Sequence, residues 1–220
     1  MSLLQLGFVG LSVLLVMMFA WATRSRRVLV VGLVWLALTG GVAWSGWLSD
    51  FSAVPPRIFF VLIPTFVMVL VIGLTGFGKK LAVLPWWFLV GYQAFRIPVE
   101  LLIHKAVETG VAPEQMTWTG LNYDILTGVS ALVLAPFASK LNHTAIAVWN
   151  TIGLGLLGWV VGVAVLSYPS PLQQLKPDNT WVAEFPYLWL PTVMVSSALL
   201  GHLAVYRKLR SEKRRALKRA

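Results

Sequence analysis

Long runs of apolar residues constrain this chain more than any other feature of its sequence. A helix needs roughly 20 predominantly apolar residues to cross a hydrocarbon core about 30 Å thick. Such runs cover residues 3–22, 28–48, 58–77, 83–105, 124–139, 144–167 and 185–206. Only 12% of the residues are charged, about half the share of a soluble domain. The strands of a membrane barrel are short and alternating, so these continuous runs predict an all-α integral membrane protein with seven transmembrane helices.

The positions of the basic residues predict the orientation of these helices. Of the 18 lysines and arginines, 14 lie in the segments after the first, third, fifth and seventh runs. The segments on the other side hold Arg57, Lys105 and Lys176, and Arg96 lies within a run. Because loops rich in lysine and arginine stay in the cytoplasm, we expect the N-terminus outside and the C-terminus in the cytoplasm.

The same distribution explains the formal net charge of +10. Residues 1–206 are expected to form one seven-helix domain, followed by a basic cytoplasmic tail at 207–220. Each basic residue near an anionic membrane surface contributes about 1 kcal/mol of attraction. The predicted partners are therefore the lipid bilayer and, at the tail, its anionic headgroups, and no nucleic acid is expected. The chain has no cysteine, which excludes disulfides and thiol chemistry.

A weak internal similarity relates the two halves of the chain. The segments GVAW (41–44) and IPTFVMV (63–69) recur as GVAV (162–165) and LPTVMVS (190–196). Both copies would have the same orientation, which predicts a 3+1+3 parallel repeat, with three helices on either side of a fourth, as in some small transporters. Chance similarity between apolar segments is the alternative.

The fourth run carries ionisable side chains on one face. A helical rotation of about 100° per residue places Gln93, Arg96, Glu100 and His104 within an arc of about 80°. A charge at the bilayer centre costs at least ~2.5 kcal/mol, so this face is expected to point into the bundle. Arg96 and Glu100 are four residues apart and can form an ion pair within the helix. We hypothesise a substrate or proton site here; a buried pair that only fixes helix packing is the alternative.

Pro98 is expected to bend the same run. Proline has no backbone N–H, so the carbonyl group of Ala94 loses its helical donor. Pro98 lies between Arg96 and Glu100, and the resulting kink would lie at the polar face. A bent helix with a polar face at mid-depth is typical of a binding site, which strengthens the functional hypothesis.

A second polar group precedes the fifth run, within the segment MTWTGLNYDILTG (116–128). Asn122 and Asp124 are candidate site residues at the outer end of this helix, and Trp118 and Tyr123 are secondary candidates at the depth of the membrane interface. Asp124 is explained equally well as a helix N-cap. If these residues instead face the polar side of the fourth run, carboxylates, an imidazole and a guanidinium would line one pocket open to the outside.

Metal and haem binding are not predicted. Glu100 and His104 have the i, i+4 spacing of two ligands on one helix, but zinc sites use more histidines than lie nearby. His202 is expected near the cytoplasmic end of the seventh run, away from Glu100. Trp149 and Asn150, secondary candidates within the sixth run, are explained most simply by helix packing. The sequence identifies no cofactor.

Four segments carry a family resemblance: FRIPVELLIH, MTWTGLNYDILTG, WNTIGLGLL and FPYLWLP. They resemble the recurrent RIPVE, MTF-G-N-DILTG and FP-WLP blocks of a family of uncharacterised bacterial multi-pass membrane proteins, over about residues 55–205. The resemblance implies a bacterial inner-membrane location and no particular activity. At 118–119 this chain has Trp-Thr where the family more often shows an aromatic residue and a glutamate. The residues that match the family blocks are Arg96, Glu100, Asn122, Asp124, Trp149, Asn150 and Trp189.

The sequence is compatible with three functions. The first is a small transporter or permease-like protein with an outward-facing polar pocket on the fourth helix, in which Glu100 takes up a proton and Arg96 is its partner. The second is an intramembrane enzyme acting on a lipid or isoprenoid, with Glu100 or Asp124 as general acid or base and His104 assisting. The third is a non-catalytic assembly or binding subunit. A small-molecule or lipid ligand fits the first two; substrate and oligomeric state are not predicted.

Overall fold

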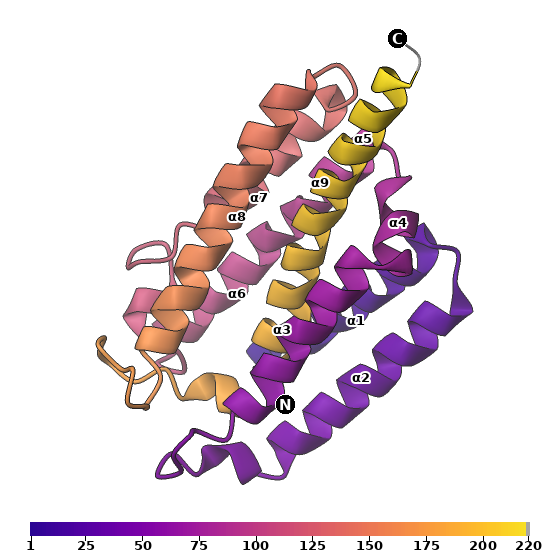
Figure 1. Cartoon of the computed structure of the whole chain (residues 1–220). Coiled ribbons are helices and arrows are strands. Elements are labelled where there is room, and N and C mark those ends of the chain that lie inside the picture. The colour runs from indigo at the N-terminus through magenta and orange to yellow at the C-terminus, as the bar shows by residue number, and fades with distance from the viewer. Residues whose placement is uncertain (219–220) are drawn as a thin grey trace.

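The structure is a computed structural model that describes residues 1–218. Within that range it is helical and contains no strand, and most helices run along one common direction (Figure 1). The predicted all-helical class is confirmed. The α-helices are α1 (Leu3–Ala22), α2 (Arg26–Trp44), α3 (Phe59–Leu74), α4 (Gly76–Ala82), α5 (Trp86–Gly91), α6 (Arg96–Glu108), α7 (Ile125–Leu134), α8 (His143–Leu166) and α9 (Ser196–Leu217). Three further helical segments contribute to the region of the site. They are the 3-10 helices η2 (Tyr92–Phe95) and η4 (Ala135–Phe137) and the π-helix η6 (Leu190–Val195).

Three helices of residues 1–218 are long and apolar enough to cross a membrane: α1, α2 and α8. α1 begins with a capping box, in which Ser2 and Gln5 each accept a hydrogen bond from the other's backbone N–H. Ser25 and Asn142 cap α2 and α8 by accepting a hydrogen bond from the first turn. These polar caps set where the apolar helices begin.

A fourth span results if α3 and α4 are counted together. α3 ends at Leu74, α4 begins at Gly76, and the two axes differ by 62°. The turn brings Gly78 so close to Gly73 that a β-carbon at position 78 would lie 1.8 Å from the carbonyl oxygen of Gly73. Because only glycine fits there, the bend is built into the sequence. The run expected to be continuous over 58–77 is therefore broken.

The fourth run, 83–105, is also divided. α5 ends at Gly91, η2 forms a tight 3-10 turn, and α6 begins at Arg96. Pro98 thus lies in the first turn of α6, where a backbone N–H has no helical partner to lose. Ala94, four residues before Pro98, lies in this 3-10 turn, and the kink expected from Pro98 stays a prediction.

The fifth and seventh runs also differ from the expectation. α7 is continued by η4 only as far as Phe137, and η6 leads directly into α9. α9 extends to Leu217, so the basic segment predicted as a tail from residue 207 is largely the end of this helix. Its last two residues, 219 and 220, lie outside the described residues. By length and composition, residues 1–218 contain three or four membrane-spanning helices instead of the predicted seven.

α9 lies in the middle of the bundle, where it packs against α3, α4 and α8 (Figure 1). Its buried side contains mostly small or polar residues, among them Ser197, Gly201 and His202. A β-carbon at Gly201 would lie 2.6 Å from the side-chain nitrogen Nε2 of Gln93. This close packing brings the centre of α9 to the beginning of α6, where the polar residues gather.

α2 joins the bundle through two tryptophans. Trp35 donates a hydrogen bond from Nε1 to the carbonyl oxygen of Thr192 at 3.3 Å. Trp189 donates from Nε1 to the carbonyl oxygen of Leu36 at 3.2 Å and to the hydroxyl of Thr39 at 3.1 Å. These bonds fix α2 to η6 and to the segment before it.

Candidate functional site

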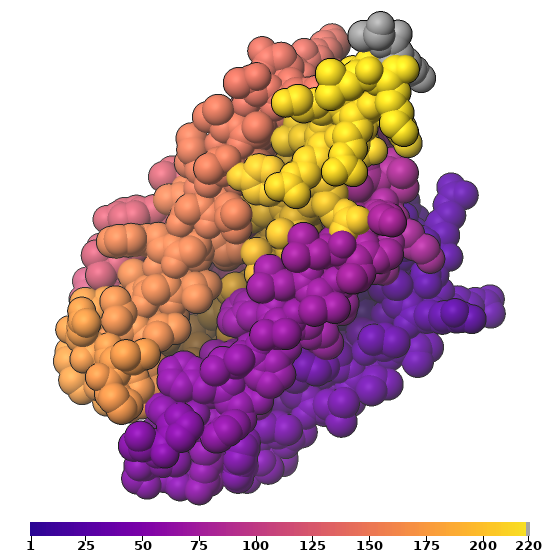
Figure 2. Space-filling view, in the orientation of Figure 1, coloured from indigo at the N-terminus to yellow at the C-terminus, as the bar shows by residue number. Residues whose placement is uncertain are grey.

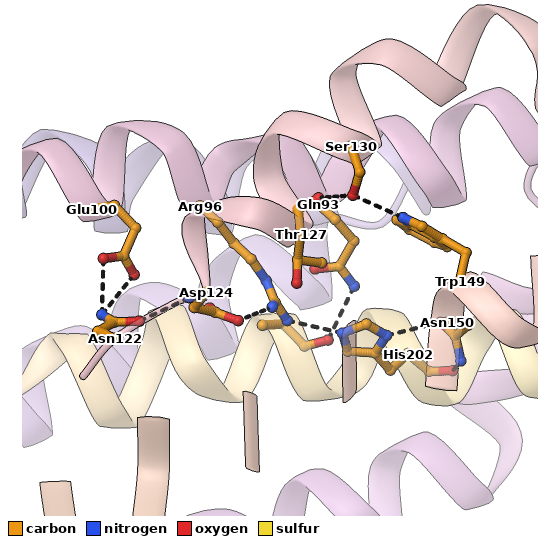
Figure 3. A network of polar contacts seen from close by, with 11 residues as sticks. Gln93, Arg96, Glu100, Asn122, Asp124, Thr127, Ser130, Trp149, Asn150 and His202 are labelled. Carbon is orange, nitrogen blue, oxygen red and sulfur yellow. Dashed lines mark hydrogen bonds and ion pairs between the residues drawn. The ribbon is translucent and has the colours of Figure 1, made fainter. Parts of the chain in front are cut away.

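Arg96 is the centre of a buried polar network (Figure 3). Its side chain is 2% exposed, one terminal nitrogen forms an ion pair with Asp124, and the other lies 2.9 Å from Nε2 of His202. α6 and α7 approach closely here, since a β-carbon at Gly128 of α7 would lie 3.0 Å from the backbone nitrogen of Ile97 in α6. Glycine at position 128 therefore brings the start of α7 within reach of the guanidinium.

The hydrogen bonds of His202 define its tautomer. A guanidinium has donors and no acceptor, so Nε2 of His202 must accept the hydrogen bond from Arg96. The proton is then on Nδ1, which donates to Oδ1 of Asn150 at 2.8 Å. Asn150 in turn donates from Nδ2 to the backbone carbonyl oxygen of His202 at 3.3 Å. His202 is thus a neutral connector between the guanidinium and α8.

Glu100 lies one helical turn after Arg96 and is also 2% exposed. Both of its carboxyl oxygens lie near Nδ2 of Asn122, at 3.0 and 2.8 Å, and the same nitrogen donates to the carbonyl oxygen of Met116 at 2.9 Å. Because an amide nitrogen has two hydrogens for these three acceptors, Glu100 receives about one hydrogen bond. Within residues 1–218 no cation lies at ion-pair distance from Glu100.

The expected ion pair between Arg96 and Glu100 is therefore wrong. Arg96 reaches across to Asp124 on the segment before α7, while Glu100 points to Asn122. Asp124 occupies the N-cap position of α7, but its side chain makes no capping hydrogen bond. Its own backbone N–H donates instead to Oδ1 of Asn122 at 2.9 Å. The carboxylate is left for the guanidinium.

His104 lies apart from this network. Its ring is 30% exposed, stacks on Trp118 with centroids 4.2 Å apart, and has Nδ1 3.1 Å from the hydroxyl of Thr117. Tyr123 is 44% exposed. Of the candidates named from the sequence, Arg96, Glu100, Asn122 and Asp124 are brought together, whereas His104, Trp118 and Tyr123 are at the periphery.

The secondary candidates Gln93, Trp149 and Asn150 connect helices. Gln93 is fully buried and donates from Nε2 to the carbonyl oxygen of Ala198 at 3.2 Å. Trp149 donates from Nε1 to the hydroxyl of Ser130 at 3.0 Å. Asn150 is fully buried and joins α8 to His202. These bonds fasten η2, α7, α8 and α9 to one another.

His202 is the residue that sequence reasoning missed. It was expected near a cytoplasmic helix end, but α9 continues beyond it to Leu217 and the ring is fully buried. The signal was the neighbouring Gly201 and Ser197, which mark a closely packed face. A β-carbon at Gly153 of α8 would lie 2.9 Å from Cε1 of His202, so α8 is also shaped around this ring.

A cavity of about 100 Å³ ends at this network. Its polar end is formed by Arg96, Glu100, Asn122 and Asp124. Most of its remaining wall is apolar, and comes from α3, α6, α8, η6 and the start of α9. The apolar lining includes Phe59, Leu62, Phe66, Val99, Leu157, Val161, Leu190 and Met194. The surroundings of Glu100 are thus more apolar than the polar pocket expected from the sequence.

The cavity is covered at the end that bears the long loops. Ile58, Tyr168, Asn179 and Val182 line it there, and each is less than a tenth exposed. The helices α3 and α8 form facing walls, and Figure 2 shows a recess between them with the beginning of α9 at its floor. The route into the cavity therefore runs sideways between α3 and α8.

Residues 1–218 contain no group of three histidine, cysteine, aspartate or glutamate residues placed to hold a metal ion. Glu100 and His104 share a helix but contact different partners, Asn122 and Thr117. Comparison with known protein families, with curated proteins and with solved structures finds no match. The site is therefore interpreted from its own geometry.

Proposed function

We propose that the protein is a multi-pass protein of the bacterial inner membrane whose chain crosses the bilayer seven times. Four of these passes would consist of shorter or broken helices: α3 with α4, α5 with α6, α7 with η4, and η6 with α9. Broken helices are tolerated in a bilayer where other helices cover them. In Figure 1 the turn after α1, α4 and the end of α9 lie towards the same end of the bundle. This supports an orientation with these basic segments in the cytoplasm.

Reporter fusions test the orientation. Green fluorescent protein fused to the C-terminus should fluoresce, and alkaline phosphatase at the same position should be inactive, because the C-terminus is cytoplasmic. The opposite pair of results would invert the orientation. The 3+1+3 repeat, which would relate α2 and α3 to α8 and α9, stays a prediction.

The exposed basic residues at the end of α9 are proposed to lie against anionic headgroups. Arg207 and Lys208 instead cap the backbone carbonyls of Gly73 and Leu84, at 2.9 and 2.6 Å. Lys213, Arg214, Arg215 and Lys218 are exposed, and are free to contact lipid. We expect a peptide with the sequence of the tail to bind phosphatidylglycerol vesicles. This binding should be lost at high salt.

The function that the geometry favours is binding of a membrane amphiphile. The observation that carries this proposal is a mostly apolar cavity, bordered by α3 and α8, that ends at a buried carboxyl group. Within residues 1–218 this carboxyl group, that of Glu100, is not part of an ion pair. An apolar chain would enter sideways from the bilayer, with its head group at Glu100. The permease-like hypothesis is thereby narrowed to a lipid-like substrate in place of a water-soluble one.

Affinity for such a ligand would come from its head group. Lipid tails are as apolar as the side chains of the cavity, so moving a chain from lipid into the protein gains little free energy. A hydrogen bond to a charged group contributes about 1.5–3 kcal/mol. Glu100 is therefore the residue that would hold the ligand, and the apolar wall would set the chain's shape and entry.

An acid–base enzyme acting on the same amphiphile is the second candidate. It is favoured by the position of Glu100, which lines the cavity and retains free acceptor capacity. Such a group can take or give a proton at a bound head group. Overexpression of the wild-type protein, but not of a Glu100→Gln variant, should then change the composition of the lipid extract. An unchanged extract would leave binding or transfer as the function.

Native mass spectrometry of the protein released from its own membrane tests the binding proposal. Wild type should retain one amphiphile, and Val161→Phe, which fills the cavity from α8, should lose it. Val148→Phe is the matched control, because Val148 is on the same helix and 53% exposed. Equal retention by both variants, or no bound amphiphile in wild type, would contradict amphiphile binding in this cavity.

A further inference from the structure

The hydrogen-bond donors at the polar end of the cavity are fewer than the acceptors. Arg96 directs one N–H of each terminal nitrogen to Asp124 and His202, and its enclosed Nε has no hydrogen-bond partner within residues 1–218. Asn122 uses Nδ2 for Glu100 and Met116. A guanidinium has five N–H donors, so three N–H groups of Arg96 remain at this end.

Acceptors are in excess at the same place. The two oxygens of Glu100 share one amide nitrogen, although a carboxylate has about four acceptor sites. Asp124 uses Oδ1 for Arg96, and its other carboxylate oxygen has no hydrogen bond within residues 1–218. Tyr168, at the covered end of the cavity, has a hydroxyl that can donate or accept. The polar end thus offers acceptors more than donors.

The charges of these side chains also disfavour an anionic head group. Arg96 is balanced by Asp124, so an ionised Glu100 leaves the group with one excess negative charge, and a protonated Glu100 leaves it neutral. In neither state can the site balance an anionic head group. A hydroxyl head group fits both states, because it donates to a carboxylate and accepts from a carboxylic acid.

We propose that the ligand is an amphiphile with an uncharged hydroxyl head group, bound by a hydrogen bond to Glu100, and that the site rejects anionic amphiphiles of the same chain. This inference rests on the proposed amphiphile binding. It adds the chemical class of the head group, which a merely apolar cavity would not determine.

A series of ligands with one chain length tests the proposal. Hexadecanol, hexadecylamine and hexadecanoate are each added to the protein in phosphatidylcholine nanodiscs, and bound ligand is counted by native mass spectrometry. Like charges a few ångströms apart in a partly buried site repel strongly. Hexadecanol should therefore bind at least about tenfold more tightly than hexadecanoate, a difference of about 1.4 kcal/mol.

The variant Glu100→Gln should remove this discrimination, bringing hexadecanoate to within about threefold of hexadecanol. Glu108→Gln is the control, since Glu108 is on the same helix with its side chain 50% exposed and outside the cavity. It should keep the wild-type preference, and tryptophan fluorescence on heating should show both variants folded.

The outcomes separate the two proposals. Equal binding of all three ligands, or the tightest binding by hexadecanoate or hexadecylamine, would overturn the hydroxyl head group while leaving amphiphile binding intact. If none of the three ligands binds and Val161→Phe behaves as wild type, the proposed function itself is wrong.

Discussion

The two ends of the buried network differ in whether their charges are paired. At one end, Arg96, Asp124, His202 and Asn150 bond to one another and join α6, α7, α8 and α9. At the other end, Glu100 has one amide donor and borders the cavity. Both ends are buried ionisable clusters in an apolar chain, yet only at the first is each charge paired with an opposite charge within residues 1–218. We therefore assign a structural role to the first and ligand binding to the second.

This comparison predicts that substitutions at the charge-paired end reduce stability and that substitutions at Glu100 change ligand binding. Breaking a buried pair leaves an uncompensated partner, which is costly in a low-dielectric interior. Altering a carboxyl that has spare acceptor capacity leaves few groups unpaired.

The largest effect is expected for Arg96→Met. The substitution leaves Asp124 buried without its cation and removes the donor to His202, so the free energy of unfolding should fall by about 3–5 kcal/mol. Unfolding in mixed micelles, followed by the fluorescence of the 11 tryptophans, measures this. The double variant Arg96→Met with Asp124→Asn should recover part of the loss. Wild-type stability of Arg96→Met would refute the structural role.

A smaller loss is expected for His202→Phe, which keeps an aromatic side chain and removes both nitrogens. The guanidinium of Arg96 and the amide of Asn150 each lose a partner, at a cost of about 1–3 kcal/mol. The same unfolding measurement applies. Trp149→Phe, which removes only the bond to Ser130, should cost less and serves as the comparison; the reverse order would contradict the assignment.

Glu100→Gln should change the free energy of unfolding by less than about 1 kcal/mol, because a glutamine can still accept the hydrogen bond from Asn122. Its main effect should be the altered ligand preference described above. A large loss of stability without a change in ligand preference would place Glu100 with the structural end of the network.

The smallest change in the free energy of unfolding is expected for a substitution in the loop before η6. Lys176 contacts Asp178 at 2.5 Å on the surface, and this hydrogen bond lowers the pKa of Asp178. A lowered folded-state pKa stabilises the fold above the usual pKa of aspartate, and the contribution is lost as pH falls through the folded value. Because both groups are exposed to solvent, Lys176→Ala should cost only about 0–1 kcal/mol at neutral pH and nothing in acid. Melting curves across pH measure this.

The sequence predicted the helical class and the burial of Arg96 and Glu100, since an apolar chain cannot leave charges facing lipid. It did not predict their partners. Helical spacing describes neighbours within one helix, whereas Asp124 reaches Arg96 because Gly128 lets α7 approach. Similarly, His202 enters the network through the close packing at Gly201, which periodicity alone does not reveal.

The breaks in the helices were missed for a related reason. Apolar composition continues past Gly73 in the third run and through η2 in the fourth, so the runs look continuous although the helices are interrupted. The position of Pro98 indicated an irregularity in the fourth run, and the 3-10 turn η2 lies just before α6. These breaks give α3 and α6 the directions that border the cavity.

The most direct test of amphiphile binding in this cavity is an experimental structure of the protein in nanodiscs made from its native membrane lipids. We predict an elongated density that enters between α3 and α8 and ends within hydrogen-bonding distance of Glu100. A continuous column of water from Glu100 to the loop-covered end, or side chains that close the cavity completely, would contradict it.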